Sequence, residues 1–213
     1  MSSMTWSAFV AFLIAITLGA MVPGPTTALV IRRSALHGVR AALPLVAGIE
    51  VGLYAWVVAS AVGVAAVLAA SEAAYTALRV VGAAVLIFLG VQAWLAARRI
   101  TEDSPPESVP GAAGRWWSSA TTGAVTHLSN PKVAVFMVAF FPQFVPAHSN
   151  VLLTTLLLGL LQVAIDGGWY LLVAAFAGTV GKAIATARFR RRLERVTGMV
   201  LIGLGARMAI SKL

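Results

Sequence analysis

The sequence predicts an all-α integral membrane protein with about six transmembrane helices. Of its 213 residues, 60% are hydrophobic and 11% are charged, whereas roughly 25% are charged in a typical soluble chain. Long stretches carry one charged residue or none, and a spanning helix needs about 20 mainly apolar residues. The apolar runs are continuous and rich in alanine, leucine and valine, which favours helices over the alternating strands of a β-barrel.

The uncharged runs place these helices in order. The first span carries no charged residue before Arg32, and the second carries only Glu50. The third is uncharged over most of its length, the fourth holds a single lysine and the fifth holds only Asp166. The sixth is the weakest because it has charged residues near its ends, and five full spans would move one terminus across the membrane. The predicted ranges are 5–31, 42–70, 74–97, 117–141, 150–180 and 193–211.

Residues 98–116 form a polar linker that divides one membrane domain into two three-helix repeats, 1–97 and 117–213. Lysine and arginine gather in the first, third and fifth loops, whereas the second and fourth loops have almost none. Short basic loops usually face the cytoplasm, so we predict that side for them. This bias accounts for the net charge of +9 without nucleic-acid binding.

Two segments of the chain match at a constant offset. Residues 49–54 (IEVGLY) match residues 165–170 (IDGGWY), which pairs Glu50 with Asp166. The same offset pairs residues 79–82 (RVVG) with 195–198 (RVTG). Three spans per half would turn the second copy over relative to the first, so the sequence predicts two inverted repeats, as in many secondary transporters.

Helix-breaking residues occur inside the first and fourth predicted spans. Proline removes a backbone hydrogen bond and glycine permits unusual dihedral angles. Broken backbone at membrane depth is tolerated where it is buried in protein or lines a wet cavity. We therefore expect helices 1 and 4 to be interrupted at a substrate site, although a packing kink is the alternative. The residues concerned are Pro23, Gly24, Pro25, Asn130, Pro131 and Lys132.

These motifs together resemble the LysE/RhtB superfamily of amino-acid exporters. The Pro-Gly-Pro and Asn-Pro-Lys runs, the Phe-Pro-Gln-Phe at 141–144 and the spacing of Asp166 and Trp169 carry the resemblance, which covers nearly the whole chain. It implies a bacterial inner-membrane efflux transporter for amino acids or their derivatives, with no cofactor. Glu50 departs from the family pattern, in which this position is small or apolar, and so leaves the substrate open.

Lys132, Glu50 and Asp166 are the ionisable residues deepest in the predicted spans. Each costs roughly 2.5–3.5 kcal/mol at the centre of a spanning helix, so we expect all three inside the bundle. A buried ion pair between the halves is one interpretation. In the other, Asp166 or Glu50 carries a proton in antiport and also binds the substrate ammonium, Lys132 binds its carboxylate, and Trp169 lines the cavity.

Three further features limit the interpretation. Gly48 and Gly52 lie on one helix face and predict close packing, either within the monomer or between the protomers of a homodimer. His127 lies one turn before Asn130 and is either a hydrogen-bonded structural residue or part of the pathway. A passive channel would use the same broken helices. A membrane enzyme is disfavoured because HExxH, GxSxG, P-loop and cysteine are all absent from the sequence.

Overall fold

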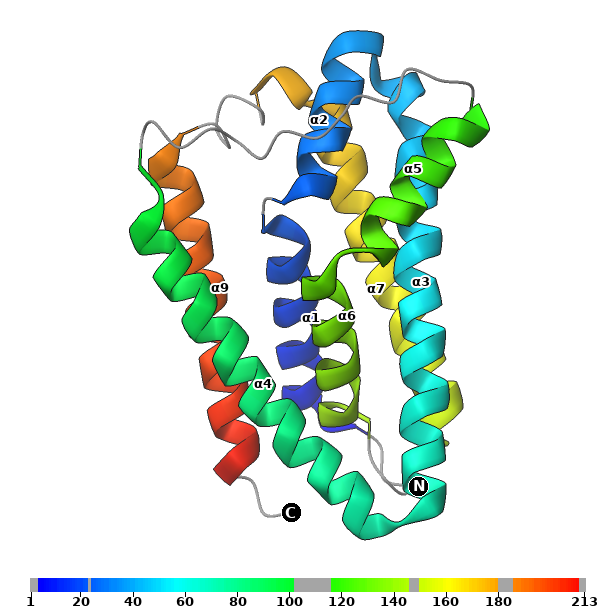
Figure 1. Ribbon diagram of the computed structural model, residues 1–213, viewed down its shortest axis with the longest axis vertical. Helices are drawn as coiled ribbons and strands as arrows, with labels where there is room; N and C mark the ends of the chain where they lie inside the picture. Colours follow the sequence, from blue (N-terminus) through cyan, green and yellow to red (C-terminus); the bar gives the residue numbers. More distant parts are fainter. Residues whose placement is uncertain (1–3, 23, 102–115, 146–149, 180–185, 211–213) are drawn as a thin grey trace.

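The computed structural model describes residues 4–22, 24–101, 116–145, 150–179 and 186–210. Every regular element in these ranges is helical, and most helices run along the long axis of an elongated bundle (Figure 1). The elements are α1 (Trp6–Met21), α2 (Pro25–His37), α3 (Val39–Ala70), α4 (Glu72–Arg99), α5 (Trp116–Leu128), α6 (Pro131–Phe140), the 3₁₀ helix η1 (Phe141–Gln143), α7 (Val151–Ala175) and α9 (Ala187–Ile210).

The described helices confirm an all-helical membrane protein. Helices α3, α4 and α7 are each long and apolar enough to cross a membrane. Helices α1 and α2 together qualify as one broken span that is bent by 58°. Helices α5 and α6 have only 13 and 10 residues and are each too short to span alone. Helix α9 begins with an arginine-rich turn and lies outside this group. The count among the described residues is thus three spans, or four with the bent pair, and six spans stay a prediction.

Both predicted helix interruptions are present. Helix α1 ends at Met21, and α2 begins at Pro25 with Gly24 as its extended N-cap residue. Proline suits this first position because its missing N–H would have no helical partner there. In the second half α5 ends at Leu128 and α6 begins at Pro131. The carbonyl of Asn130 accepts the N–H groups of the third and fourth residues of α6, at 3.1 Å each.

Polar side chains and one glycine set the other helix boundaries. Ser71 separates α3 from α4 and caps α4, because its hydroxyl accepts the N–H of Ala74 at 3.3 Å. Asn150 caps α7 by accepting the N–H of Leu153 at 3.0 Å. Gly38 joins α2 to α3 with a φ of 83°, a conformation that glycine adopts without steric cost. The first span was predicted to end at residue 31, whereas α2 continues to the residue before Gly38.

Close helix packing depends on glycine. Gly48 and Gly52 of α3 lie against Ala120 and Ala124 of α5, so the predicted glycine face packs within the chain. Helices α4 and α9 lie side by side (Figure 1), and their glycines contact each other. A Cβ on Gly90 would lie 2.7 Å from the carbonyl oxygen of Gly198, and a Cβ on Gly198 would lie 2.6 Å from the carbonyl oxygen of Gly90. Backbones this close leave no space for a side chain and allow extensive van der Waals contact.

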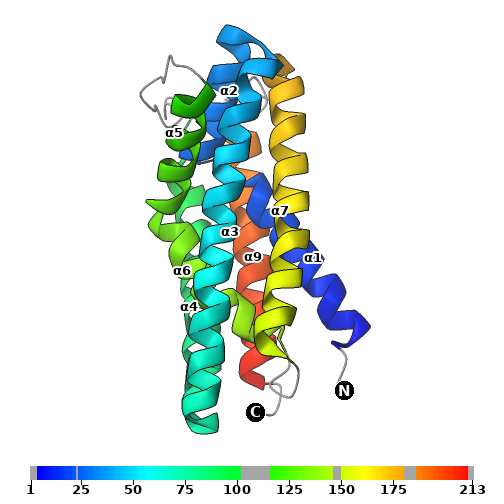
Figure 2. The same cartoon turned by 90° about the vertical axis from the view of Figure 1, so that its right-hand side faces the viewer.

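Buried hydroxyl and amide groups join elements from the two halves of the sequence. The Ser34 hydroxyl of α2 donates to the Ala174 carbonyl of α7 at 2.6 Å, and Ser60 of α3 donates to Met137 of α6 at 3.1 Å. Gln143, in the Phe-Pro-Gln-Phe run, donates its amide N–H to the Arg79 carbonyl of α4 at 2.8 Å. Helices α3 and α7 lie side by side in both views (Figure 2), so the two matching acidic positions face a shared interface.

Candidate functional site

A cavity of about 550 Å³ lies where the two helix interruptions meet. Val22, Gly24 and Pro25 line it at the first break, and Ser129 and Asn130 line it at the second. Helices that stop in the middle of the bundle leave backbone groups facing this space, because terminal amides and carbonyls have no partner within their own helix. The broken backbone therefore borders a cavity, as membrane-depth breaks require.

Several helices contribute polar side chains to the wall of the cavity. On α7 the contributing residues are spaced four apart, which places them on one helix face. The apolar part of the wall comes from side chains such as Leu53, Phe136 and Met137. The polar residues of the described lining beyond the breaks are Thr26, Thr27, Thr126, His127, Gln162, Asp166, Tyr170, Glu194 and Thr197.

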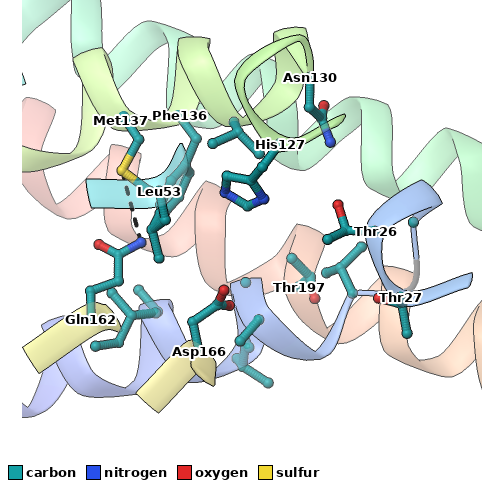
Figure 3. Close-up of a pocket in the computed structure, with 18 of the residues that line it drawn as sticks. Thr26, Thr27, Leu53, His127, Asn130, Phe136, Met137, Gln162, Asp166 and Thr197 are labelled. Atoms are coloured by element: carbon teal, nitrogen blue, oxygen red, sulfur yellow. Dashed lines mark hydrogen bonds between the residues drawn. The ribbon is translucent and has the colours of Figure 1, made fainter. Parts of the chain in front are cut away.

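Asp166 is the buried acid of this wall. It is 8% exposed, it lines the cavity from α7, and its Oδ2 atom has no hydrogen-bond partner in the described structure. Figure 3 shows its carboxyl group directed into the space between α7 and the helices opposite. A buried carboxyl oxygen without a donor is unfavourable, so this oxygen is available to a ligand or a proton.

Glu50 lies directly behind Asp166 and outside the cavity lining. It belongs to α3, and its side chain packs on α7 at Gly167, where a Cβ would lie 3.4 Å from the Glu50 Cγ and Cδ atoms. Both Glu50 carboxyl oxygens are buried, and the group lies within electrostatic and hydrogen-bonding range of the Asp166 carboxyl group. The acids at matching positions of the two halves are thus neighbours.

His127 occupies the wall across from Asp166 (Figure 3). It is 5% exposed, and neither ring nitrogen has a hydrogen-bond partner among the described residues. Its backbone lies close to α3 because Gly52 leaves room there: a Cβ on Gly52 would lie 3.2 Å from the His127 Cβ. A buried imidazole normally has a partner on at least one nitrogen, so both nitrogens here can bind a cavity ligand.

Two further polar groups on α7 complete this wall. Gln162 donates to the Met137 sulfur at 3.8 Å, whereas its Oε1 atom is buried without a partner. Tyr170 lies beside Thr26 and Thr27 of α2 and within electrostatic range of both acids. The cavity therefore offers several hydrogen-bonding groups on the same wall as Asp166.

An aromatic cluster lies beside the cavity. Phe136 lines the cavity and stacks on Phe140 with ring centroids 4.5 Å apart. Phe140 in turn contacts Phe12 at 5.4 Å and Phe144 at 4.6 Å. Phe12 and Phe140 are fully buried. This aromatic cluster joins α1 to α6 beside the cavity.

The structure brings four of the sequence-predicted site residues together, and it places others elsewhere. Gly24, Pro25, Asn130 and Asp166 all line the cavity. Trp169 does not line it: the half-buried indole packs against an apolar cluster between α2, α3 and α7. Pro23 lies outside the described residues, as do the side chains of Pro131 and Lys132, whose backbone begins α6.

Sequence reasoning missed most of the hydrogen-bonding wall. Thr26, Thr27 and Thr197 are common residues in apolar helices and gave no separate signal. Gln162 and Tyr170 could have been found, because they lie four residues before and after Asp166 on the same helix face. Within the described ranges, no group of three or more histidine or acidic residues is arranged to hold a metal ion.

Comparisons with known proteins place the chain among membrane translocators. The LysE type translocator family model matches residues 17–212. A homoserine/homoserine lactone efflux protein of Salmonella typhimurium is 30% identical over 98% of this chain and 99% of its own length. A leucine efflux protein of Klebsiella pneumoniae is 24% identical over 94% of each chain, and an uncharacterized membrane protein of Vibrio cholerae is 28% identical over 96% of this chain and 97% of its own.

No solved structure matches the chain. The family model nevertheless covers all the described helices from the end of α1 onward, including both breaks and the cavity. With its apolar helices and its full-length membrane relatives, the chain belongs to the LysE type translocator family.

Proposed function

We propose that this protein is a secondary-active exporter of amino acids or their derivatives in the bacterial inner membrane, driven by the proton gradient. The observation that carries the proposal is Asp166, a buried acid with an unpartnered oxygen in a cavity between two broken helices. Ionisable residues inside membrane spans are expensive and usually mark substrate or proton pathways. Relatives named as efflux proteins for homoserine and for leucine support the direction and the substrate class.

Proton coupling rests on competition at Asp166. Two ionised carboxyl groups in contact repel strongly in an interior of low dielectric, so we expect Glu50 and Asp166 to hold one proton between them when the cavity has no cation. A substrate ammonium in the cavity would replace that proton as the positive partner of Asp166. The acid then binds either the proton or the substrate, which is the requirement for exchange of one for the other.

The carboxylate of the substrate would bind at the helix breaks. The first amides of α2, at Thr26 and Thr27, lie at a helix N-terminus, where the helix dipole attracts anions. Helix α6 presents a second N-terminus at the same cavity, preceded by Asn130. Lys132, in the first turn of α6, would add a full positive charge. Substrate-binding helix breaks of this kind occur in several transporter folds.

The architecture proposed for this function has six spans in two inverted repeats, 1–97 and 117–213, joined by the 98–116 linker. Two features support it: each half carries one interrupted helix, and the matching helices α3 and α7 pack on each other. The basic loops are proposed to face the cytoplasm. Energy would come from the membrane gradients, since one charge moved through 100 mV yields about 2.3 kcal/mol.

Inverted membrane vesicles test the proposal directly. A panel of labelled amino acids is offered to vesicles with and without an imposed proton gradient, with wild type and Asp166→Asn compared at equal protein levels. We expect wild type to concentrate at least one amino acid against its gradient, only when the proton gradient is present, and Asp166→Asn to lose this accumulation. Equilibration without accumulation in wild type would indicate a passive facilitator and would overturn the proposal.

A further inference from the structure

The unused hydrogen-bonding groups of the cavity are concentrated around His127. Both ring nitrogens of this residue are buried without a hydrogen-bond partner among the described residues, and the residue is 5% exposed. A neutral imidazole has one N–H donor and one acceptor nitrogen. Leaving both unpaired is unfavourable, so we expect a ligand in the cavity to accept the imidazole N–H.

Gln162 provides a third unused group in the same part of the cavity. Its Oε1 atom is buried without a partner, and its amide nitrogen is occupied only by the weak contact to the Met137 sulfur. Figure 3 shows Gln162 and His127 on different walls, with Leu53, Phe136 and Met137 around them. A neutral group that both donates and accepts hydrogen bonds matches an imidazole and an amide oxygen better than a carboxylate, which only accepts.

We propose that His127 and Gln162 determine substrate specificity by hydrogen-bonding a hydroxyl or amide group on the substrate side chain, while Asp166 holds the ammonium. A hydroxyl group can accept the imidazole N–H and can donate to the glutamine oxygen, so it suits either residue. The inference rests on the proposed function and narrows it from amino acids in general to those with a neutral polar side chain.

Family membership does not decide this point. One relative is named for homoserine efflux and another for leucine efflux, and these two amino acids differ in the presence of a side-chain hydroxyl. The selection must therefore be read from the groups that line the cavity of this chain. A site built to bind a hydroxyl rejects an analogue without it strongly, because its own polar groups are then left unpaired.

Threonine and valine are the matched probes, since they have almost the same shape and differ in one hydroxyl. Initial rates for both are measured in proteoliposomes that contain the full-length protein. We expect wild type to prefer threonine by about tenfold or more. His127→Leu and Gln162→Leu are each expected to reduce this preference to about threefold or less, chiefly by slowing threonine. His127→Asn, which keeps a donor and an acceptor, should restore part of it.

Two control variants separate specificity from folding. Thr155→Val removes a buried, unpartnered hydroxyl from α7 outside the cavity, and His37→Leu removes an exposed imidazole at the end of α2. Both should keep the wild-type threonine preference. Equal rates for threonine and valine in wild type would overturn the inference alone. Equal loss of both rates in the His127 and Gln162 variants would do the same. Failure to transport any amino acid would overturn the proposed function.

Discussion

At the scale of the residue, the two acids have different positions and should have different effects. Asp166 faces the cavity, whereas Glu50 lies behind it against Gly167. Only Asp166 can touch a molecule in the cavity. Glu50 can act through the charge and proton that it shares with its neighbour, so it is a positioning residue in the proposed mechanism.

Glu50→Gln should therefore be milder than Asp166→Asn. The amide keeps the shape that packs on Gly167 and removes the like charge beside Asp166. We expect about a tenfold loss of proton-driven accumulation, against about a hundredfold or more for Asp166→Asn, because a hydrogen bond to a charged group contributes roughly 1.5–3 kcal/mol. Accumulation assays in vesicles compare the two. Equal losses would place Glu50 at the substrate itself.

Lys132→Ala should act on the carboxylate end of the substrate. We expect threonine transport to fall by about tenfold or more, while threoninamide, which has no carboxylate, falls by less than about twofold. Competition of each compound with a labelled substrate provides the measurement. If both compounds are affected alike, Lys132 has no role in carboxylate binding.

The sequence predicted some residues of the candidate site and missed others, and hydrogen bonding explains the difference. Thr121 and Thr122 in α5 satisfy their hydroxyls on carbonyls of the preceding turn, at 2.9 and 2.7 Å, as threonine commonly does in helices. Thr197 is also a threonine in a helix, yet its buried hydroxyl has no partner among the described residues. Local sequence does not distinguish these cases, because the difference depends on which helix lies opposite.

At the scale of the element, the breaks were predictable because their cause is local. Proline has no N–H to donate, and the helices begin at Pro25 and Pro131 as that chemistry requires. The placement of Trp169 was not predictable in the same way. One turn from Asp166, it could face either the cavity or α2, and packing against the α2 cluster decides the outcome.

Glycine contacts in α3 give a stability prediction with a control on the same helix. A Cβ on Gly48 would overlap the Ala120 carbonyl of α5, whereas a Cβ on Gly63 meets nothing within 4 Å. Gly48→Ala should cost about 1–3 kcal/mol by overpacking, and Gly63→Ala should be neutral or slightly stabilising. Thermal unfolding of purified protein in detergent would show this difference, and equal melting temperatures would refute the packing interpretation.

At the scale of the whole molecule, the all-helical class and the membrane location follow from composition, since no other arrangement buries so many apolar residues with so few charges. The number of full spans does not follow. Helix α9 combines an arginine-rich start with a glycine-mediated contact to α4, and this contact can hold it in the bundle despite a composition that is weak for a span.

The absence of native cysteine makes the predicted topology testable by single-cysteine labelling. Ala70→Cys lies at the turn between α3 and α4, and Ser108→Cys lies in the linker sequence. With basic loops in the cytoplasm, a membrane-impermeant maleimide should label Ala70→Cys in intact cells and Ser108→Cys only in inverted vesicles. Labelling of both cysteines from the same side would contradict an odd number of membrane spans between these two loops.

The most direct test of the account measures proton movement during substrate transport. Proteoliposomes with an internal pH-sensitive dye receive an amino-acid gradient and no imposed pH gradient. Wild type should move protons opposite to the amino acid, and Asp166→Asn should move none. Substrate-dependent proton movement of wild-type size in Asp166→Asn, or amino-acid transport by wild type without any proton movement, would contradict the claim that one buried acid exchanges the proton for the substrate.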